Sequence, residues 1–306
     1  MCTIHSLYTG TAKVTCSEID LKMMRFRQLG NTDMRVSILG MGGSGFGNVY
    51  GKYNEEEAKR AIRQAFDKGI NYIDTAVWYG QGKSESFLGR ALSGIPRSAF
   101  YIATKVGRYE RDVQKMFDFS AEKVTSSAWE SLKRLQLQYV DVLQVHDVEF
   151  APSLDVIIDE TLPALQKLKE QGLCRYIGIT GYPLGPLKEV ITRSPVRVDS
   201  VLTYCRLTLN DSSLRNDFEF FRAKGVSIIN ASSVGMGLLT KAGVQYWHPA
   251  SSEIKEACSA ALRHCGDQGV DIGRIATNYS ASFEEVYNYI TVLGLRHLGV
   301  TYCCNT

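Results

Sequence analysis

Short apolar runs alternate with amphipathic segments along most of the chain. Each run has the length of a strand, and both of its faces are apolar, which is typical of parallel strands buried on both sides. Seven runs are clear and an eighth is a candidate. The predicted strands are residues 36–40, 70–74, 100–104, 140–145, 174–180, 199–204 and 226–230, with 289–293 as the candidate eighth.

The segments between these runs carry apolar residues at helical spacing. The first such face covers residues 58–66, and Asn54 and Glu57 precede it in the arrangement of a capping box. Glycines that follow several of these helical segments are placed to cap them and to lead into the next strand. Further apolar faces lie in 124–135, 162–168, 214–221 and 254–265, and the capping glycines are Gly69, Gly172, Gly225 and Gly269.

Repeated strand–helix units without a break in composition favour a (β/α)8 barrel of the TIM type. The last strand–helix unit is expected to be altered or incomplete. An open doubly wound sheet is the alternative. We expect one barrel domain over residues 24–306. Residues 1–23 lack the apolar core of a signal peptide and are predicted to form a poorly ordered extension.

Composition narrows the class of function. The chain has 306 residues and a formal net charge of +3, and no run of Lys and Arg stands out, so nucleic-acid binding has little support. No apolar stretch has the length of a transmembrane helix. None of the eight cysteines forms a CxxC pair, which favours reduced thiols. We therefore predict a cytoplasmic protein that binds neither nucleic acid nor membrane; its oligomeric state stays open.

GMGGSG, residues 40–45, matches the glycine spacing of a dinucleotide-binding fingerprint. That fingerprint requires a helix to begin at once and an acidic residue shortly after. Here a further loop intervenes before the helix, and Asp74, which ends the next strand, lies too far along the chain. A glycine-rich first loop at a barrel mouth is the better interpretation.

Four polar side chains fall where predicted strands end. Asp74 ends the second strand, Tyr79 lies in the loop after it, Lys105 ends the third strand and His146 follows the fourth. Because active sites of such barrels form at the C-terminal ends of the strands, we expect these groups to converge. Taken singly, each has a structural alternative: a turn-capping Asp, a packed loop Tyr, a surface Lys and a core His.

Together the four groups make a coherent acid–base set. A tyrosine has a reference pKa of about 10, which is high for proton transfer near neutral pH. The ammonium of Lys105 is expected to lower the pKa of Tyr79, and Asp74 to hold Lys105 in place. His146 is placed to hydrogen-bond a substrate oxygen. The set suits proton transfer beside a carbonyl or hydroxyl, and no cluster has metal-ligand spacing.

At this point the sequence resembles the aldo-keto reductases. The matching stretches, in family order, are LGMGGSGFG, IDTAVWYGQGKSESFLGRAL, YIATKVGR, VDVLQVHD, CRYIGIT and INASSVGMGLL. The resemblance implies a (β/α)8 barrel that binds NADP or NAD and transfers hydride between nicotinamide C4 and a substrate carbon. It also implies that Tyr79 is the proton donor, that Lys105 tunes it, that Asp74 orients Lys105 and that His146 orients the carbonyl.

The same resemblance implies the cofactor contacts. Thr180 and Gly181 match a pair that usually reads Ser-Asn and holds the nicotinamide carboxamide, so the contact at Gly181 is expected to be weakened or moved. The nicotinamide-stacking tyrosine is replaced by Ala231. The implied cofactor-binding residues are Gly42, Gly43, Ser44, Asp74, Thr180, Gly181, Tyr204, Ser232, Ser233 and Gly235.

Within the family, KVGRY, MFDFS, VHDVEFA, GITGYPL and INAS resemble the L-galactose dehydrogenase group and its sugar dehydrogenase relatives. The implied reaction oxidises a free aldose to its lactone, with Tyr79 acting as the base. Trp78, Arg108, Phe119 and His146 are expected to line the substrate pocket. The particular sugar or aldehyde, and the preference between NADP and NAD, stay open.

The resemblance weakens after about residue 280. We expect the usual cluster for the adenosine 2′-phosphate and the closing helix to be missing from the final segment. The alternative function is therefore a catalytically weak or inactive protein that acts as a nucleotide-sensing or regulatory partner. A phosphate-binding barrel enzyme of another type is a third candidate, but it leaves the four convergent groups unexplained.

Overall fold

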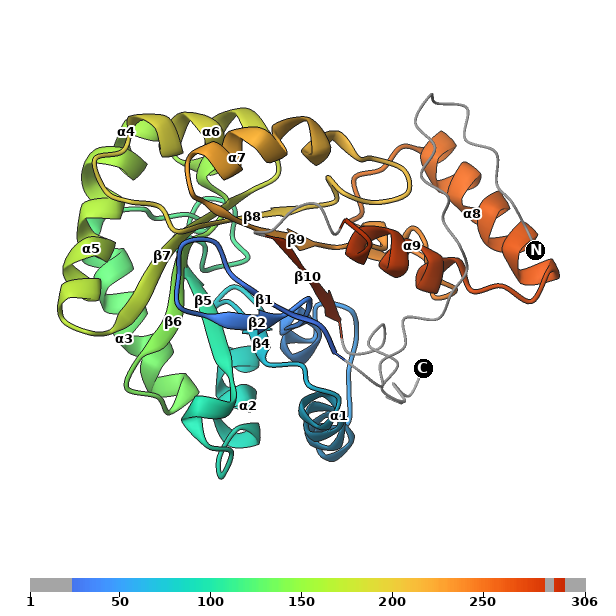
Figure 1. Ribbon diagram of the computed structural model, residues 1–306, viewed down its shortest axis with the longest axis horizontal. Helices are drawn as coiled ribbons and strands as arrows, with labels where there is room; N and C mark the ends of the chain where they lie inside the picture. The colour runs from blue at the N-terminus through green and yellow to red at the C-terminus, as the bar shows by residue number, and fades with distance from the viewer. Residues whose placement is uncertain (1–23, 284–288, 295–306) are drawn as a thin grey trace.

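Eight parallel strands close into a barrel in this computed structural model, which describes residues 24–283 and 289–294 (Figure 1). The strands follow chain order around the barrel, and the last pairs with the first. The barrel prediction, including its eighth strand, is therefore confirmed, and the open-sheet alternative is wrong. The strands are β3 (Leu39–Gly42), β4 (Tyr72–Asp74), β5 (Tyr101–Val106), β6 (Val140–Val145), β7 (Cys174–Gly181), β8 (Ser200–Tyr204), β9 (Ser227–Ala231) and β10 (Tyr289–Gly294).

Helices surround the barrel, and α8 projects furthest from it (Figure 1). A single π-helical turn, η4 (Ile157–Thr161), joins α4 and α5 into one continuous helical segment. The α-helices are α1 (Glu55–Asp67), α2 (Lys83–Ala91), α3 (Ala121–Leu135), α4 (Leu154–Val156), α5 (Leu162–Glu170), α6 (Leu184–Arg193), α7 (Phe218–Ala223), α8 (Ser252–Asp267) and α9 (Ile272–Ala281).

The predicted helix ends are present where the sequence placed them. The side chain of Asn54 accepts a hydrogen bond from the backbone N–H of Glu57, which caps the N-terminus of α1. The four glycines expected to end helices all adopt left-handed backbone angles, which an L-residue with a side chain rarely tolerates. Their φ values are 86° at Gly69, 80° at Gly172, 67° at Gly225 and 69° at Gly269.

The first predicted strand, residues 36–40, is divided between two elements. Its beginning belongs to β2 (Arg35–Ser37), which pairs antiparallel with β1 (Phe26–Gln28). Its end belongs to the barrel strand β3, which pairs with β4 and β10. One apolar run therefore serves both a hairpin and the barrel, because the chain changes pairing partners at Ile38.

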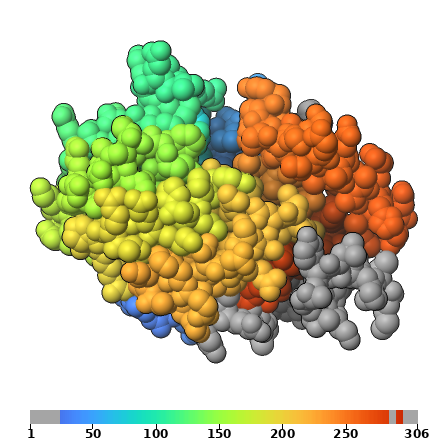
Figure 2. All heavy atoms as spheres, turned by 90° about the horizontal axis from the view of Figure 1, so that it is seen from above, coloured from blue at the N-terminus to red at the C-terminus, as the bar shows by residue number. Residues whose placement is uncertain are grey.

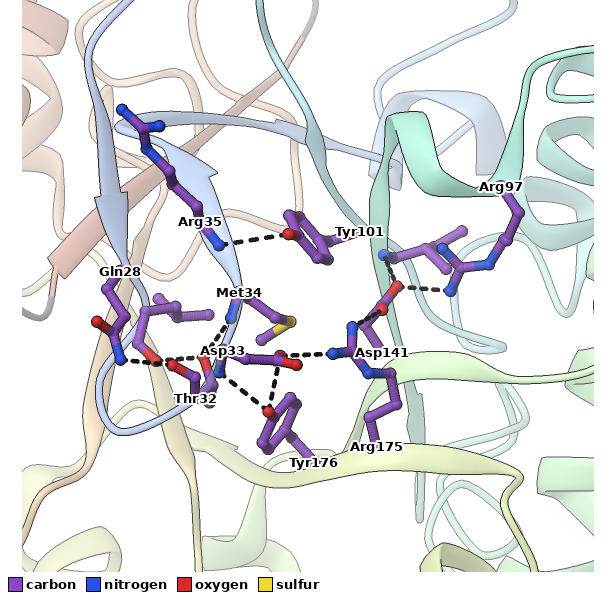
Figure 3. Close-up of polar contacts among 12 residues, drawn as sticks. Gln28, Thr32, Asp33, Met34, Arg35, Arg97, Tyr101, Asp141, Arg175 and Tyr176 are labelled. Atoms are coloured by element: carbon purple, nitrogen blue, oxygen red, sulfur yellow. Dashed lines mark hydrogen bonds and ion pairs between the residues drawn. The ribbon is translucent and has the colours of Figure 1, made fainter.

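The β1–β2 hairpin covers the N-terminal end of the barrel, where the strands begin (Figure 3). Asp33, in the turn of the hairpin, accepts a hydrogen bond from the hydroxyl of Tyr176 at 2.8 Å and pairs with Arg175. The Tyr101 hydroxyl accepts from the backbone N–H of Arg35 at 3.3 Å. Because one end is covered in this way, ligands have access to the barrel from the C-terminal ends of the strands.

Apolar side chains pack in two principal layers. An inner cluster, which includes Met34, Tyr72, Val142 and Ile290, fills the barrel interior together with the hairpin. A larger outer cluster joins the strands to the surrounding helices. Both faces of the strands are thus buried, which accounts for the continuous apolar runs seen in the sequence.

The predictions about membrane spans and cysteines can be compared with the described residues, whereas those about the two chain ends cannot. No described helix is long and apolar enough to cross a membrane. The four cysteines within these residues, Cys174, Cys205, Cys258 and Cys265, carry free thiols. The predicted extension over 1–23 and the tail beyond residue 294 lie outside the described residues.

Candidate active site

The structure brings the four predicted polar groups together at the C-terminal end of three adjacent strands. Asp74 is the last residue of β4, Lys105 lies one residue before the end of β5, and His146 directly follows β6. Tyr79 lies in the turn between β4 and α2. Pairing of β4 with β5 and of β5 with β6 places the strand ends side by side.

Lys105 is the centre of this group. Its side chain is 1% exposed, and its ammonium donates to Asp74 Oδ1, to the carbonyl oxygen of Thr75 at 2.8 Å and to the Tyr79 hydroxyl at 3.5 Å. Burial opposes the charged form, but the opposing charge of Asp74 and the contact with Tyr79 outweigh it, so the pKa of Lys105 is raised. The lysine is therefore held as a buried cation, with oxygen atoms as acceptors.

The net pKa shift of Tyr79 has the opposite direction to the one predicted from the sequence. The Lys105 ammonium acts to lower the pKa of Tyr79, as the sequence predicted. Burial is the larger effect, and the carboxylates of Asp74 and Asp147 add to it, so the net pKa of the phenol is raised. The phenol is consequently protonated at neutral pH, and Lys105 limits the cost of removing the proton.

His146 faces Tyr79 edge to face, with ring centroids 6.1 Å apart and an interplanar angle of 87°. Burial and the nearby positive charges of Lys105 and Arg108 lower the pKa of His146 well below its usual range. The imidazole is therefore neutral at physiological pH. A neutral imidazole suits hydrogen bonding to a substrate oxygen and leaves proton transfer to Tyr79.

Gln144 is a member of the site that the sequence analysis missed. Its Nε2 donates to Asp74 Oδ2 at 2.8 Å, from a fully buried position on β6. Asp74 is thus held by Lys105 through one oxygen and by Gln144 through the other. The sequence signal was available: Gln144 is an amide near the end of the mainly apolar run VDVLQV, two residues before His146.

Arg108 forms the centre of an aromatic wall beside the acid–base group. Its Nη1 pairs with Asp147 Oδ2 at 2.7 Å, and its guanidinium lies 4.2 Å from the ring centroid of Trp78. The second ring near Arg108 is that of Phe117, at 5.3 Å. The predicted pocket residue Phe119 is 3% exposed and stacks on the ring of Phe117. It therefore packs against the aromatic wall and contributes little surface of its own.

The residues of the first loop lie next to Asp74. Gly42 ends β3 in register with Asp74, and the backbone N–H of Gly43 donates to the Asp74 carbonyl oxygen at 2.7 Å. Ser44 begins the short helix η1 (Ser44–Gly47). These positions place the backbone of the first loop at the same barrel end as Tyr79 and Lys105.

The other predicted cofactor-binding residues lie at the ends of the next three strands. Thr180 and Gly181 end β7, and Tyr204 ends β8. The Thr180 hydroxyl accepts from the backbone N–H of Asp147 at 2.9 Å, which ties β7 to the segment that carries His146. All of these positions share the barrel end that holds the acid–base group.

The segment after β9 carries a buried hydroxyl that no described residue satisfies. Ser232 and Gly235 adopt φ values of 60° and 59°, and the buried hydroxyl of Ser233 has no hydrogen-bond partner among the described residues. A buried hydroxyl without a partner is costly unless a ligand or water satisfies it. Figure 2 shows a hollow in the molecular surface between the orange and green segments, with blue atoms from an early part of the chain visible in it.

The family assignment rests on the length of the sequence match. A sequence model of the Aldo/keto reductase family matches residues 38–297, which span all eight barrel strands. The chain belongs to this family. Aldo-keto reductases use NAD(P)H, and the residues described above, including the unsatisfied Ser233 hydroxyl, fit a dinucleotide at the barrel mouth.

Two dehydrogenases are similar to this protein over most of the chain. L-galactose dehydrogenase of Arabidopsis thaliana is 47% identical over 266 residues, 86% of this chain and 82% of that protein. D-arabinose 1-dehydrogenase of Saccharomyces cerevisiae is 35% identical, over 81% of this chain and 76% of that protein.

A solved structure of the family has the same fold. The aldo-keto reductase AKR11C1 from Bacillus halodurans, in its holo form, superposes with a TM-score of 0.70 at 28% sequence identity. The superposition covers 90% of this chain and 89% of that one. This chain is thus an aldo-keto reductase in fold as well as in sequence.

Proposed function

We propose that this aldo-keto reductase oxidises the anomeric carbon of a free, L-galactose-like aldose to a lactone, with NADP or NAD as oxidant. The observation that carries the proposal is the position of Lys105, whose buried ammonium lies among the oxygens of Asp74, Thr75 and Tyr79. A buried cation beside a phenol is placed to stabilise the phenolate that accepts the sugar proton.

In the oxidative direction, the phenolate form of Tyr79 takes the proton from the anomeric hydroxyl of the sugar and becomes a neutral phenol. Lys105 stabilises the phenolate before this transfer, and Asp74, held by Gln144, keeps Lys105 in position. His146, as a neutral donor, orients the sugar oxygen. A bound nicotinamide dinucleotide would supply the acceptor for the hydride of the anomeric carbon. The anomeric oxygen therefore loses a proton and the anomeric carbon loses a hydride, so that this carbon becomes the carbonyl carbon of the lactone.

The sugar substrate is supported by two observations. The two similar proteins named above are both sugar dehydrogenases by name. The wall formed by Arg108, Trp78 and Phe117 offers a guanidinium edge for hydroxyl groups and aromatic faces for the C–H faces of a sugar ring. The positive charge of Arg108 is balanced by Asp147, which suits a neutral ligand.

The proposal is tested by steady-state kinetics with purified protein. Free aldoses, with L-galactose first, are supplied with NADP or NAD, and formation of reduced nicotinamide is followed by absorbance. Simple aldehydes are tested in the reductive direction with reduced cofactor. Oxidation of an aldose in preference to reduction of simple aldehydes supports the proposal. Good aldehyde reduction without oxidation of any aldose would overturn the sugar assignment.

The nucleotide-sensing alternative is separated from the enzyme by one variant. Tyr79→Phe removes the proton-transfer group but keeps the ring, so a sensing protein would bind dinucleotide and partners unchanged and have no turnover to lose. An enzyme would lose turnover and keep its affinity for the dinucleotide.

A further inference from the structure

Glu149 occupies the space that a side chain at position 181 would fill. It lies in η3 (Val148–Phe150), the short helical turn that follows His146 and Asp147. A Cβ atom added to Gly181 would come within 2.5 Å of Glu149 Oε2 and 3.3 Å of Leu187 Cδ2. A carboxylate from the β6 side of the barrel therefore reaches across to the end of β7.

Of the two carboxylate oxygens of Glu149, one accepts a hydrogen bond and the other has no donor among the described residues. Oε1 accepts a hydrogen bond from the backbone N–H of Tyr182 at 2.8 Å, which fixes the side chain beside Gly181. Oε2 is buried and has no hydrogen-bond partner among the described residues. Burial, with the negative charge of Asp147 nearby, raises the pKa of Glu149 to about 6. Near neutral pH the group is mostly an anion, and its Oε2 lacks a donor among the described residues.

We propose that Glu149, rather than residue 181, supplies the hydrogen-bond acceptor for the carboxamide of the bound nicotinamide. This inference rests on the proposed function and on the family resemblance, which implies that the nicotinamide carboxamide lies at Thr180 and Gly181. An amide N–H₂ offers two donors in a plane, and an ionised carboxylate is a stronger acceptor than a neutral amide oxygen. Binding would satisfy the buried oxygen that the ligand-free chain leaves without a donor.

The proposal makes Gly181 part of the same contact. With no side chain, Gly181 leaves room for the Glu149 carboxylate. The backbone of Gly181 is not in the left-handed region, so the chain geometry itself would accept a larger residue. What excludes a side chain there is Glu149. Positions 149 and 181 are thus alternative sources of one acceptor, and a double-mutant cycle measures whether they are coupled.

The test is a titration of each variant with NADPH and NADH, followed by quenching of tryptophan emission. Glu149→Ala is expected to weaken dinucleotide binding about tenfold or more, because a hydrogen bond to a charged group is lost. Gly181→Asn alone is expected to weaken it too, because its side chain meets Oε2. In the Glu149→Ala background, Gly181→Asn is expected to restore affinity to within about threefold of wild type.

Two control variants separate this contact from a general effect on folding. Glu149→Gln keeps an acceptor and the bond to Tyr182, and is expected to retain most of the affinity. Glu160→Ala removes a similar bond, from the Ala121 N–H to Glu160 Oε1 at 2.7 Å, outside the residues assigned to the site. Its dinucleotide affinity is expected to equal that of wild type.

The outcomes are distinguishable. A wild-type chain that binds neither dinucleotide overturns the proposed function and this inference with it. A wild-type chain that binds while Glu149→Ala binds equally well overturns the inference alone. An unchanged dinucleotide affinity with a raised aldose KM in Glu149→Ala would assign Glu149 to the sugar, and would also overturn the inference.

Discussion

Gln144 and Asp74 are joined by a buried hydrogen bond of 2.8 Å between Nε2 and Oδ2. The other carboxylate oxygen of Asp74 accepts from Lys105, whose ammonium also contacts Tyr79. The bond therefore begins a chain of polar contacts that crosses three adjacent strands and ends at the proposed proton-transfer group. This hydrogen bond should contribute substantially to the free energy of unfolding, because an unpaired carboxylate oxygen in a barrel interior is costly.

Replacing Gln144 by Leu tests this chain of contacts. Asp74 Oδ2 would lose its donor, so we expect the free energy of unfolding to fall by about 1–3 kcal/mol and kcat to fall with it. Urea denaturation and initial rates measure the two effects. Gln166→Leu, which alters an amide paired with Glu170 on α5, is the control and should change neither by much. Equal behaviour of the two variants would contradict the role given to Gln144.

The pH dependence of the oxidative reaction tests the assignment of Tyr79. Its pKa is raised in the ligand-free chain, so the phenolate is a minor species at neutral pH. Below the pKa that fraction grows about tenfold per pH unit. We therefore expect log kcat for aldose oxidation to rise with pH through the neutral and mildly alkaline range, and aldehyde reduction not to follow it.

His146 should add no inflection to that profile. Its pKa is lowered well below the usual value by burial, Lys105 and Arg108, so it stays neutral throughout the range. Initial rates over a pH series, corrected for cofactor stability, provide the measurement. An inflection near the ordinary histidine pKa that disappears in His146→Gln would show that the imidazole titrates during turnover, contrary to this account.

Asp141 is expected to support the closed end of the barrel without affecting the chemistry. Its buried carboxylate accepts from Arg97 at 2.6 Å, from Arg175 at 2.8 Å and from the backbone N–H of Ile102 at 2.8 Å (Figure 3). Asp141→Asn should lower the free energy of unfolding by about 1.5–3 kcal/mol, because the amide has no negative charge for the two arginines and keeps only one of the two acceptor oxygens. KM for cofactor and sugar should stay unchanged.

Asp33→Asn is the matched variant for that experiment. Asp33 pairs with the same Arg175, but its side chain is 68% exposed. An exposed pair contributes under about 1 kcal/mol, so this variant should be close to wild type in urea denaturation. A larger loss for Asp33→Asn than for Asp141→Asn would show that burial does not decide the strength of these contacts.

Glu149 also makes a prediction about stability and pH in the absence of ligand. Its pKa is raised from the reference value 4.5 to about 6 in the folded chain, so folding favours the protonated form. Stability from this group is present below pH 4.5 and is lost as the pH rises through about 6. After allowance for the partial exposure of Glu149, the free energy of unfolding falls by about 1 kcal/mol over this pH range.

Glu149→Gln cannot titrate, so its stability relative to wild type should increase between those two pH values. Urea denaturation of both proteins at a series of pH values measures the difference. A constant difference across the series would mean that Glu149 Oε2 also has a donor, which contradicts its lack of a partner among the described residues.

Periodicity was sufficient to predict the barrel, because each strand is buried on both faces and each helix has one apolar face. It failed at residues 36–40, where one apolar run is shared between β2 and β3. An apolar run records burial but does not record the pairing partner. The β1–β2 hairpin was missed for the same reason: its strands are short, and its polar contacts come from residues distant in sequence, such as Tyr176.

The acid–base group was predictable because strand ends of a parallel barrel meet at one face. Supporting residues were harder to predict. Gln144 and Phe117 act through contacts between neighbouring strands and loops, which spacing along the chain does not reveal. The net pKa of Tyr79 was also beyond the sequence, since its sign depends on whether burial or Lys105 has the larger effect.

The most direct test of the central claim compares wild type with Tyr79→Phe in two assays on the same preparations. Dinucleotide binding is measured by quenching of tryptophan emission, and L-galactose oxidation by the absorbance of reduced cofactor. We predict equal dinucleotide affinity and a loss of turnover of about a hundredfold to ten-thousandfold in the variant, the range of a general acid–base group. Turnover by Tyr79→Phe at the wild-type rate would contradict the account.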